Sequence, residues 1–156
     1  NADDIKASTQ CSDMQAAQIA TELREKQVAN KKSFTFETVL STTRNLKLLE
    51  KAKMNGFFIR CVYVLTVDPE INILRVKSRV ASGGHDVPKD IIKKRYYKAL
   101  GLLPDLIKIC DICHVYDNSK EPFRIFKKRK SDFFYWESNL WKRETIFNIV
   151  GMMDSI

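Results

Sequence analysis

The sequence has no long hydrophobic run, and this absence argues against a membrane-spanning helix. No apolar stretch approaches the roughly 20 residues that a bilayer requires. The chain opens on polar and acidic residues, Asn1 to Asp4, so we expect no signal peptide. Histidine is scarce, with only His85 and His114 present. The four cysteines are typical of free thiols in a reducing compartment, so we expect a cytoplasmic protein.

The composition is that of a folded chain with a basic surplus. Hydrophobic residues make up 44% and charged residues 29% of the 156 residues, and the net charge is +8. These values exclude a disordered chain as the first expectation, and the length fits one domain over residues 1–156.

Helical and strand-like segments alternate along the chain. Phe57 to Val67 is almost continuously apolar and β-branched, which predicts a strand buried on both faces. We therefore expect an α/β fold with a mainly parallel sheet flanked by helices and a C-terminal hairpin plus helix. The predicted strands are 33–38, 57–67, 109–116 and a hairpin of 123–128 with 133–136; the predicted helices are 12–31, 42–55, two within 68–101, and 138–152; 104–108 is a predicted connector.

The most informative segment is 75–101, where arginines stand on both sides of a glycine break. Arg75 and Arg79 are four residues apart and share one face of a helix. Gly83-Gly84-His85 interrupts that helix, and Arg95 follows on the next one. Residues 75–98 hold eight basic and two acidic residues, a net +6. We interpret 68–101 as a helical lid whose guanidinium groups meet a phosphoryl group, although a solvated basic hairpin would show the same charge count.

The pair Cys110-x-x-Cys113 with His114 has residue types that occur in metal and redox sites. Tetrahedral zinc needs four ligands at matched spacings, and the sequence offers too few histidines. The pair also does not open a helix after a strand, as a redox pair would. We therefore expect no metal site formed by these residues.

Several motifs together resemble one enzyme family, the zeta-toxin-like P-loop kinases, also called predicted ABC-type ATPases. The matching segments are Asn1-Ala2-Asp3-Asp4-Ile5, Phe36-Glu37-Thr38-x-x-Ser41, Arg75 to Pro88 with its Gly-Gly-His centre, Arg95-Tyr96 and Tyr116-Asp117-Asn118-Ser119. The resemblance extends to about Ser119. It implies a P-loop-kinase-like fold with polar residues at the carboxyl ends of strands, among them Asp3-Asp4, Glu37-Thr38, Thr66-Val67 and Asp117-Asn118.

The resemblance also implies roles for individual residues. Asp3 would accept the proton of a substrate hydroxyl, and Glu37, Thr38 and Ser41 would hold the acceptor substrate. Arg75, Arg79 and Arg95 would clamp the triphosphate of ATP, with Arg79 also stabilising the transition state. His85 would shape the lid or contact phosphate, and Asn118 would lie near the nucleotide base. The implied cofactors are ATP and Mg²⁺, the implied acceptor a small molecule such as UDP-N-acetylglucosamine, and an antitoxin protein is a possible partner.

One departure from the family pattern is large. The 156 residues contain no Gly-x-x-x-x-Gly-Lys-Ser/Thr phosphate loop. We therefore expect a segment of a longer protein that lacks the first strand and that loop, transfers no phosphoryl group by itself and binds ATP poorly. A sheet without its central strand has unpaired edges, so we also expect self-association.

Other interpretations remain open. The basic residues of 75–98 and 120–130, beside aromatic residues, could form a nucleic-acid-binding module. A continuous exposed basic face would favour that module, whereas arginines turned into a cleft would favour the kinase. A partner-binding remnant without chemistry is a third interpretation. Individually, Asp3 could solvate a terminus, Glu37 could pair with a lysine, Asn118 could be a turn residue, and the aromatic residues of 133–141 are expected in packing.

Overall fold

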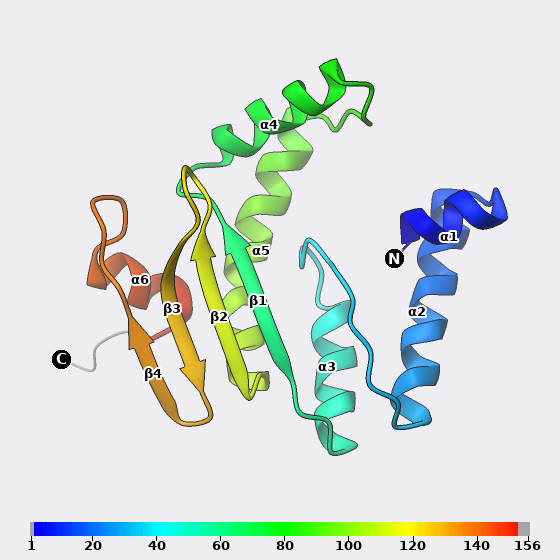
Figure 1. Cartoon of the computed structure of the whole chain (residues 1–156), viewed down its shortest axis with the longest axis horizontal. Coiled ribbons are helices and arrows are strands. Elements are labelled where there is room, and N and C mark those ends of the chain that lie inside the picture. The colour runs from blue at the N-terminus through cyan, green and yellow to red at the C-terminus, as the bar shows by residue number, and fades with distance from the viewer. Residues whose placement is uncertain (1, 153–156) are drawn as a thin grey trace.

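The computed structural model describes residues 2–152, without the side chains of residues 2–4, 7 and 13 (Figure 1). The described residues form six helices and four strands. The helices are α1 (Ala2–Thr9), α2 (Asp13–Ala29), α3 (Arg44–Met54), α4 (Pro69–Ala81), α5 (Lys89–Ile109) and α6 (Arg143–Val150). The strands are β1 (Arg60–Leu65), β2 (Ile112–Asp117), β3 (Phe123–Arg129) and β4 (Asp132–Tyr135).

The four strands form one mixed sheet in the order β1-β2-β3-β4. β1 and β2 are parallel, joined by the α4–α5 crossover, whereas β2–β3 and β3–β4 are antiparallel. The α/β class is confirmed, but the expectation of a mainly parallel sheet is wrong for the described residues. The reason is the C-terminal hairpin, which pairs with β2 and adds two antiparallel strands to a single parallel pair.

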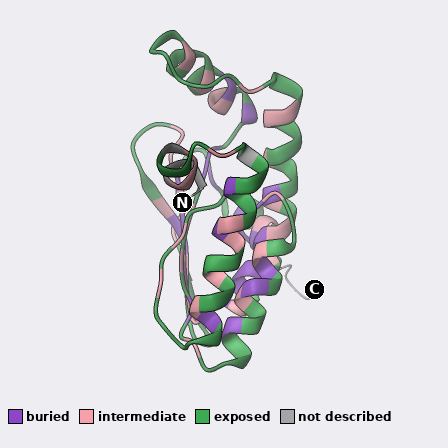
Figure 2. Cartoon of the chain, turned by 90° about the vertical axis from the view of Figure 1, so that its right-hand side faces the viewer, coloured by how far each residue is buried: buried purple, intermediate pink, exposed green. Residues whose placement is uncertain are grey.

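Helices cover one face of this sheet. Along β2, Cys113 and Val115 are buried toward the helices, whereas the alternate residues His114 and Tyr116 are only half-buried on the other face. The core joins these strands to apolar residues of α3, α5 and α6. Figure 2 shows the buried residues where these helices meet the sheet, and a mostly exposed α4 above them.

The outer strand β1 is open on its second face. Val62 and Val64 are 61% and 57% exposed, although the sequence predicted a strand buried on both faces. That prediction is wrong because β1 is the sheet edge and no described helix covers this side. The same β1 residues therefore leave an apolar strip at the sheet edge.

Three element predictions need correction. Residues 33–38 form no strand; Phe34 instead stacks on Phe36, with ring centroids 5.9 Å apart, and the segment packs as a loop. The predicted connector 104–108 is helical, because Leu103, Leu106 and Ile107 bury one side of α5 despite Pro104. The last helix begins at Arg143 rather than near Ser138, whose hydroxyl accepts hydrogen bonds from Leu140 N and Trp141 N in a turn.

Other elements are confirmed. The Ser12 side chain caps α2 in a reciprocal capping box with Gln15. The hairpin is formed by β3 and β4, and Phe133 and Tyr135 pack edge-on against Phe147 of α6. Trp141 is buried, so core packing is confirmed there, whereas Phe133, Phe134 and Tyr135 are 47%, 49% and 36% exposed and pack only in part.

Asp111 ties the lower end of the sheet together. Its carboxylate accepts a 2.7 Å hydrogen bond from the Ile59 N–H and forms an ion pair with Lys53 at the end of α3. Burial alone would raise the pKa of Asp111, but these two donors outweigh it and the pKa is lowered. The side chain therefore joins α3, the start of β1 and the start of β2.

Candidate functional site: a cleft beside β1

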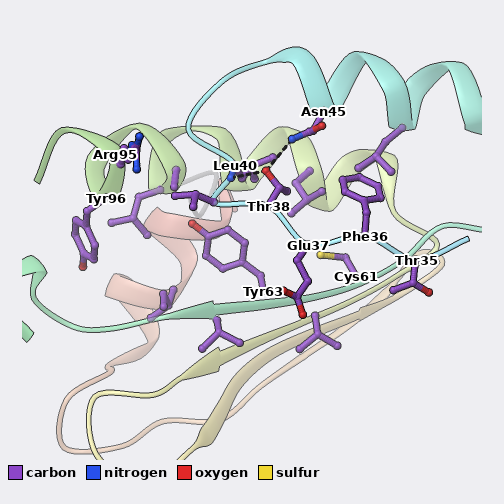
Figure 3. A pocket seen from close by; sticks show the side chains of 18 of the residues that line it. Thr35, Phe36, Glu37, Thr38, Leu40, Asn45, Cys61, Tyr63, Arg95 and Tyr96 are labelled. Atoms are coloured by element: carbon purple, nitrogen blue, oxygen red, sulfur yellow. Dashed lines mark hydrogen bonds between the residues drawn. The ribbon is translucent and has the colours of Figure 1, made fainter. Parts of the chain in front are cut away.

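A cleft with a volume of about 1030 Å³ lies along β1 (Figure 3). One wall is the 34–40 loop together with α3, and the upper wall is formed by α4 and α5. Every residue of β1, from Arg60 to Leu65, and the following Thr66 line the cleft. Because β1 is the outer strand of the described sheet, the cleft combines a strand edge with the side chains of the lid.

Three of the predicted arginines line this cleft. Arg75 and Arg79 come from α4 and Arg95 from α5, so both lid helices contribute. All three are exposed residues. The structure therefore brings together the guanidinium groups that the sequence placed on two separate helices.

Two of the arginines are fixed by main-chain carbonyl groups. Arg75 Nη2 donates to the Asn118 carbonyl at 2.5 Å, and Arg79 Nη2 donates to the His85 carbonyl at 2.9 Å. A guanidinium carries five N–H donors, so each arginine keeps donors for a ligand. His85 and Asn118 thus contact the arginines through their backbones, and their side chains are not among the described lining residues.

The glycine break has a specific geometry. α4 starts at Pro69, with the Asp68 side chain accepting from Glu70 N. It ends in a Schellman motif, in which Gly84 N donates to Arg79 O and Gly83 N donates to Val80 O, both at 2.9 Å. Gly83 has φ +86°, which favours glycine. A Cβ on Gly84 would lie 2.6 Å from Arg79 Cγ, so the arginine side chain passes directly over this glycine.

The predicted acceptor-binding residues lie on the opposite wall. Glu37 and Thr38 line the cleft, and Figure 3 shows Glu37 extending from its loop toward β1. Thr38 Oγ1 accepts hydrogen bonds from Leu40 N at 3.2 Å and from Asn45 Nδ2 at 2.7 Å. These bonds shape the loop and leave the hydroxyl proton of Thr38 free to be donated. Ser41 follows the loop and is not among the described lining residues.

Thr66 joins the lid to the sheet, and sequence reasoning assigned it no such role. It is 3% exposed at the end of β1. Its hydroxyl accepts from Asn72 Nδ2 of α4 at 3.0 Å, and its carbonyl accepts from the Tyr96 hydroxyl of α5 at 2.7 Å. Burial, with smaller effects from nearby acidic groups, raises the pKa of Tyr96 to about 12, so this hydroxyl remains a donor. The sequence feature that could have indicated this junction is Tyr96, which follows Arg95 on α5 and reaches the end of β1.

Asp3, the expected base, lies in the helix α1 rather than at a strand end. Its side chain lies outside the described residues. Glu37 and Thr38 also follow no strand, whereas Thr66 and Asp117 do stand at the carboxyl ends of the parallel pair. Two of the four expected strand-end positions are therefore wrong.

A cluster of three cysteines lies next to the cleft. The Sγ atoms of Cys61, Cys110 and Cys113 all lie within 4.8 Å of one another. Hydrogen bonds with Cys110 and Cys113 lower the pKa of Cys61 well below its usual range, whereas hydrogen bonds with Cys110 and Cys61, together with burial, raise the pKa of Cys113. The sequence predicted no metal site formed by Cys110, Cys113 and His114, and alternation along β2 turns His114 to the other face. Cys61 was missed, although a parallel pairing of its strand with β2 sets Cys61 directly opposite Cys113.

One comparison with known proteins identifies a family. The family model described as Zeta toxin matches residues 1–130. An "Uncharacterized protein" of Haemophilus influenzae is 41% identical over 63 residues, which cover 40% of this chain and 45% of the relative. The match thus spans under half of that relative. No solved structure matches the chain.

Among the described helices, none has the length and apolar character needed to cross a bilayer.

Proposed function

Because the chain belongs to the Zeta toxin family, we propose that it contributes the acceptor site and the lid of an ATP-dependent phosphotransferase. Family members are P-loop kinases that typically use ATP and Mg²⁺. The observation that carries the proposal is the cleft, where arginines of both lid helices face a loop that bears Glu37 and Thr38. Phosphoryl transfer is catalysed largely by such positioning and charge stabilisation.

In this proposal the arginines act on the phosphate groups. Arg75 and Arg95 hold phosphate oxygens from the two lid helices, since a guanidinium matches phosphate geometry. Arg79 stabilises the charge that develops on the transferred group. The hydrogen bond from Arg79 to the His85 carbonyl fixes the direction of the Arg79 side chain in the absence of a ligand. Asn118, whose carbonyl holds Arg75, is proposed to lie at the nucleotide end of the site.

The acceptor would bind at the loop wall. The Glu37 carboxylate can accept hydrogen bonds from sugar hydroxyls, and Thr38 can donate its remaining proton. Ser41 is proposed to complete this wall, and Asp3 to accept the proton of the reacting hydroxyl. A UDP-sugar such as UDP-N-acetylglucosamine fits a cleft with a carboxylate on one wall and arginines on the other.

The residues that line the cleft lack the ligands needed to bind Mg²⁺ together with ATP. Mg²⁺ in these kinases needs the hydroxyl of the phosphate loop, and the 156 residues contain no such loop. Glu37 is the one carboxylate among the described residues that line the cleft. We therefore propose that this chain binds anionic groups weakly and transfers no phosphoryl group by itself.

A titration of the isotopically labelled chain tests the binding role. We expect ATP and UDP-N-acetylglucosamine to shift the side-chain N–H resonances of Arg75, Arg79 and Arg95 in nuclear magnetic resonance spectra. Arg95→Ala should weaken binding, whereas Lys98→Ala, which removes the same charge from the same helix outside the cleft, should not. Equal losses from both substitutions would mean that only the overall charge matters, and would refute the site.

The distribution of basic residues favours this function over nucleic-acid binding. The lid arginines line a cleft. In β3, Lys128 turns toward the helices and donates to the Ile107 carbonyl at 2.7 Å, while Arg124 packs over the Trp136 ring on the other face. Lys128 is therefore separated from Arg124, Lys127 and Arg129, which remain together on the open face.

We further propose that the free edge of β1 mediates association, either with an antitoxin, which the family context suggests, or with a second copy. The open face of β1 beside this edge is apolar and exposed at Val62 and Val64. Sedimentation velocity should show concentration-dependent association that Val62→Lys weakens. Met14→Lys, at an 82% exposed position of α2, is the matched control. A chain that sediments as a monomer at all concentrations would exclude self-association.

A further inference from the structure

Three thiols from three parts of the chain converge behind the cleft. Cys61 lies on β1, Cys110 caps the end of α5, and Cys113 lies on β2. Cys110 and Cys113 are 1% and 0% exposed, and Cys61 is half-buried and lines the cleft. The cluster is thus held by the best-packed elements of the fold and opens on one side.

The spacing of the sulfur atoms matches what a metal ion needs. A zinc–sulfur bond of about 2.3 Å in a tetrahedral site places sulfur atoms about 3.8 Å apart. The three Sγ atoms already lie within 4.8 Å of one another, so movements of at most about an ångström would bring them to that spacing. Because all three are on strands or at a helix end, their backbone positions need not change.

The surroundings of the cluster also favour a cation bound by thiolates. The C-terminal end of α5 places partial negative charge beside Cys110, which attracts a cation but opposes the thiolates that would bind it. Lys128 binds the carbonyls of Ile107 and Lys108 at this helix end, at 2.7 and 3.1 Å. Three thiolates and a divalent ion carry one net negative charge, which the nearby ammonium group can offset.

We propose that Cys61, Cys110 and Cys113 form a binding site for one thiophilic divalent metal ion, with Zn²⁺ the expected ion. Three protein ligands leave a fourth position, which faces the cleft on the side of Cys61 and is open to water or to a ligand in the cleft. The thiol protons are released to solvent on binding. This site is independent of the proposed phosphotransferase role, since it uses none of the arginines or the acceptor loop.

Cadmium is the probe for this site, because cadmium thiolates absorb in the near ultraviolet. Titration of the reduced full chain under anaerobic conditions should give one Cd²⁺ per chain, and a large excess of Zn²⁺ should compete for the same site. Cys61→Ser should weaken binding about tenfold or more, the loss seen even when residues that only support a metal ligand are changed. Cys11→Ser is the matched control and should bind as the wild type does, because Cys11 lies outside the cluster.

A second measurement avoids the risk that a cysteine variant misfolds. Alkylation of the wild-type chain, followed by mass spectrometry, should show that Zn²⁺ slows the labelling of Cys61 and leaves Cys11 unchanged. Protection confined to Cys61, together with loss of the cadmium band in Cys61→Ser, supports the site. Equal labelling with and without Zn²⁺, or a cadmium band that Cys11→Ser removes and Cys61→Ser retains, overturns it. Neither result bears on the binding of ATP, so this proposal and the proposed function can fail separately.

Discussion

Replacing Gly84 with alanine should remove Arg79 from its place in the cleft without altering any charge. The new Cβ would lie 2.6 Å from Arg79 Cγ and 3.0 Å from Arg79 O. Both distances are too short, and the near side-chain atom is close to the backbone, so the whole arginine side chain must turn away. Its 2.9 Å hydrogen bond to the His85 carbonyl is then lost. We expect Gly84→Ala to behave as Arg79→Ala does.

The expected loss follows from the kind of bond that Arg79 makes. A hydrogen bond to a charged group contributes about 1.5–3 kcal/mol, which corresponds to a weakening of about 10- to 150-fold. The assay is titration of the labelled chain with inorganic triphosphate, followed by the arginine N–H resonances.

The matched control is Gly101→Ala on the exposed side of α5, where an added Cβ meets nothing within 4 Å. It should leave the affinity unchanged and stabilise the helix by about 0.5–1 kcal/mol. If Gly84→Ala binds triphosphate as tightly as the wild type, Arg79 does not bind phosphate from the position seen here.

Two further predictions concern the scaffold of the cleft. Asp111→Ala should lower the free energy of unfolding by about 1.5–3 kcal/mol in chemical denaturation, whereas Asp105→Ala, at an exposed pair, should change it by less than about 0.5 kcal/mol. The pKa of Asp111 is lowered in the folded chain. Its contribution to the free energy of unfolding is therefore complete above the unfolded pKa of about 4 and is lost as the pH falls through the folded pKa. A stability difference between the wild type and Asp111→Ala that persisted in strong acid would contradict this. Gly151→Ala should cost about 2–4 kcal/mol, since φ is +72° and the Cβ would lie 2.7 Å from Pro104 Cβ, and Gly56→Ala, with φ +84° but open space, should cost about 1–2 kcal/mol. Equal melting temperatures for the two glycine variants would show that the contact with Pro104 carries no weight.

The sequence correctly predicted the elements that depend on residues close together in the chain. The capped helix after Ser12, the hairpin and the Gly-Gly break all depend on residues within a few positions of one another. The 33–38 run failed because its aromatic and β-branched residues favour a strand, yet a strand also needs a partner edge, which no local pattern reveals. Pro104 misled for the opposite reason, since the burial of its helical neighbours outweighs the cost of proline within α5.

The site divides in the same way. The i,i+4 spacing of Arg75 and Arg79 already placed two guanidinium groups on one face. Their bonds to the carbonyls of Asn118 and His85 depend on the crossover geometry and could not be read from side-chain types. The cysteine cluster needed the register of two strands distant in sequence, and alternation along β2 then separated His114 from Cys113.

The continuity of α5 gives the two helices of the upper cleft wall different attachments. Its 21 residues form a rod about 30 Å long, with Arg95 near one end and Cys110 at the other. The C-terminal half of α5 is anchored in the core, so Arg95 is carried by a helix whose position is fixed. α4 packs against α5 and is held by the Asn72–Thr66 hydrogen bond, the Glu70–Lys93 ion pair and the bond from Arg75 to the Asn118 carbonyl. Any closure of the cleft by α4 would therefore break the bond between Arg75 and Asn118, while Arg95 would stay in place on α5.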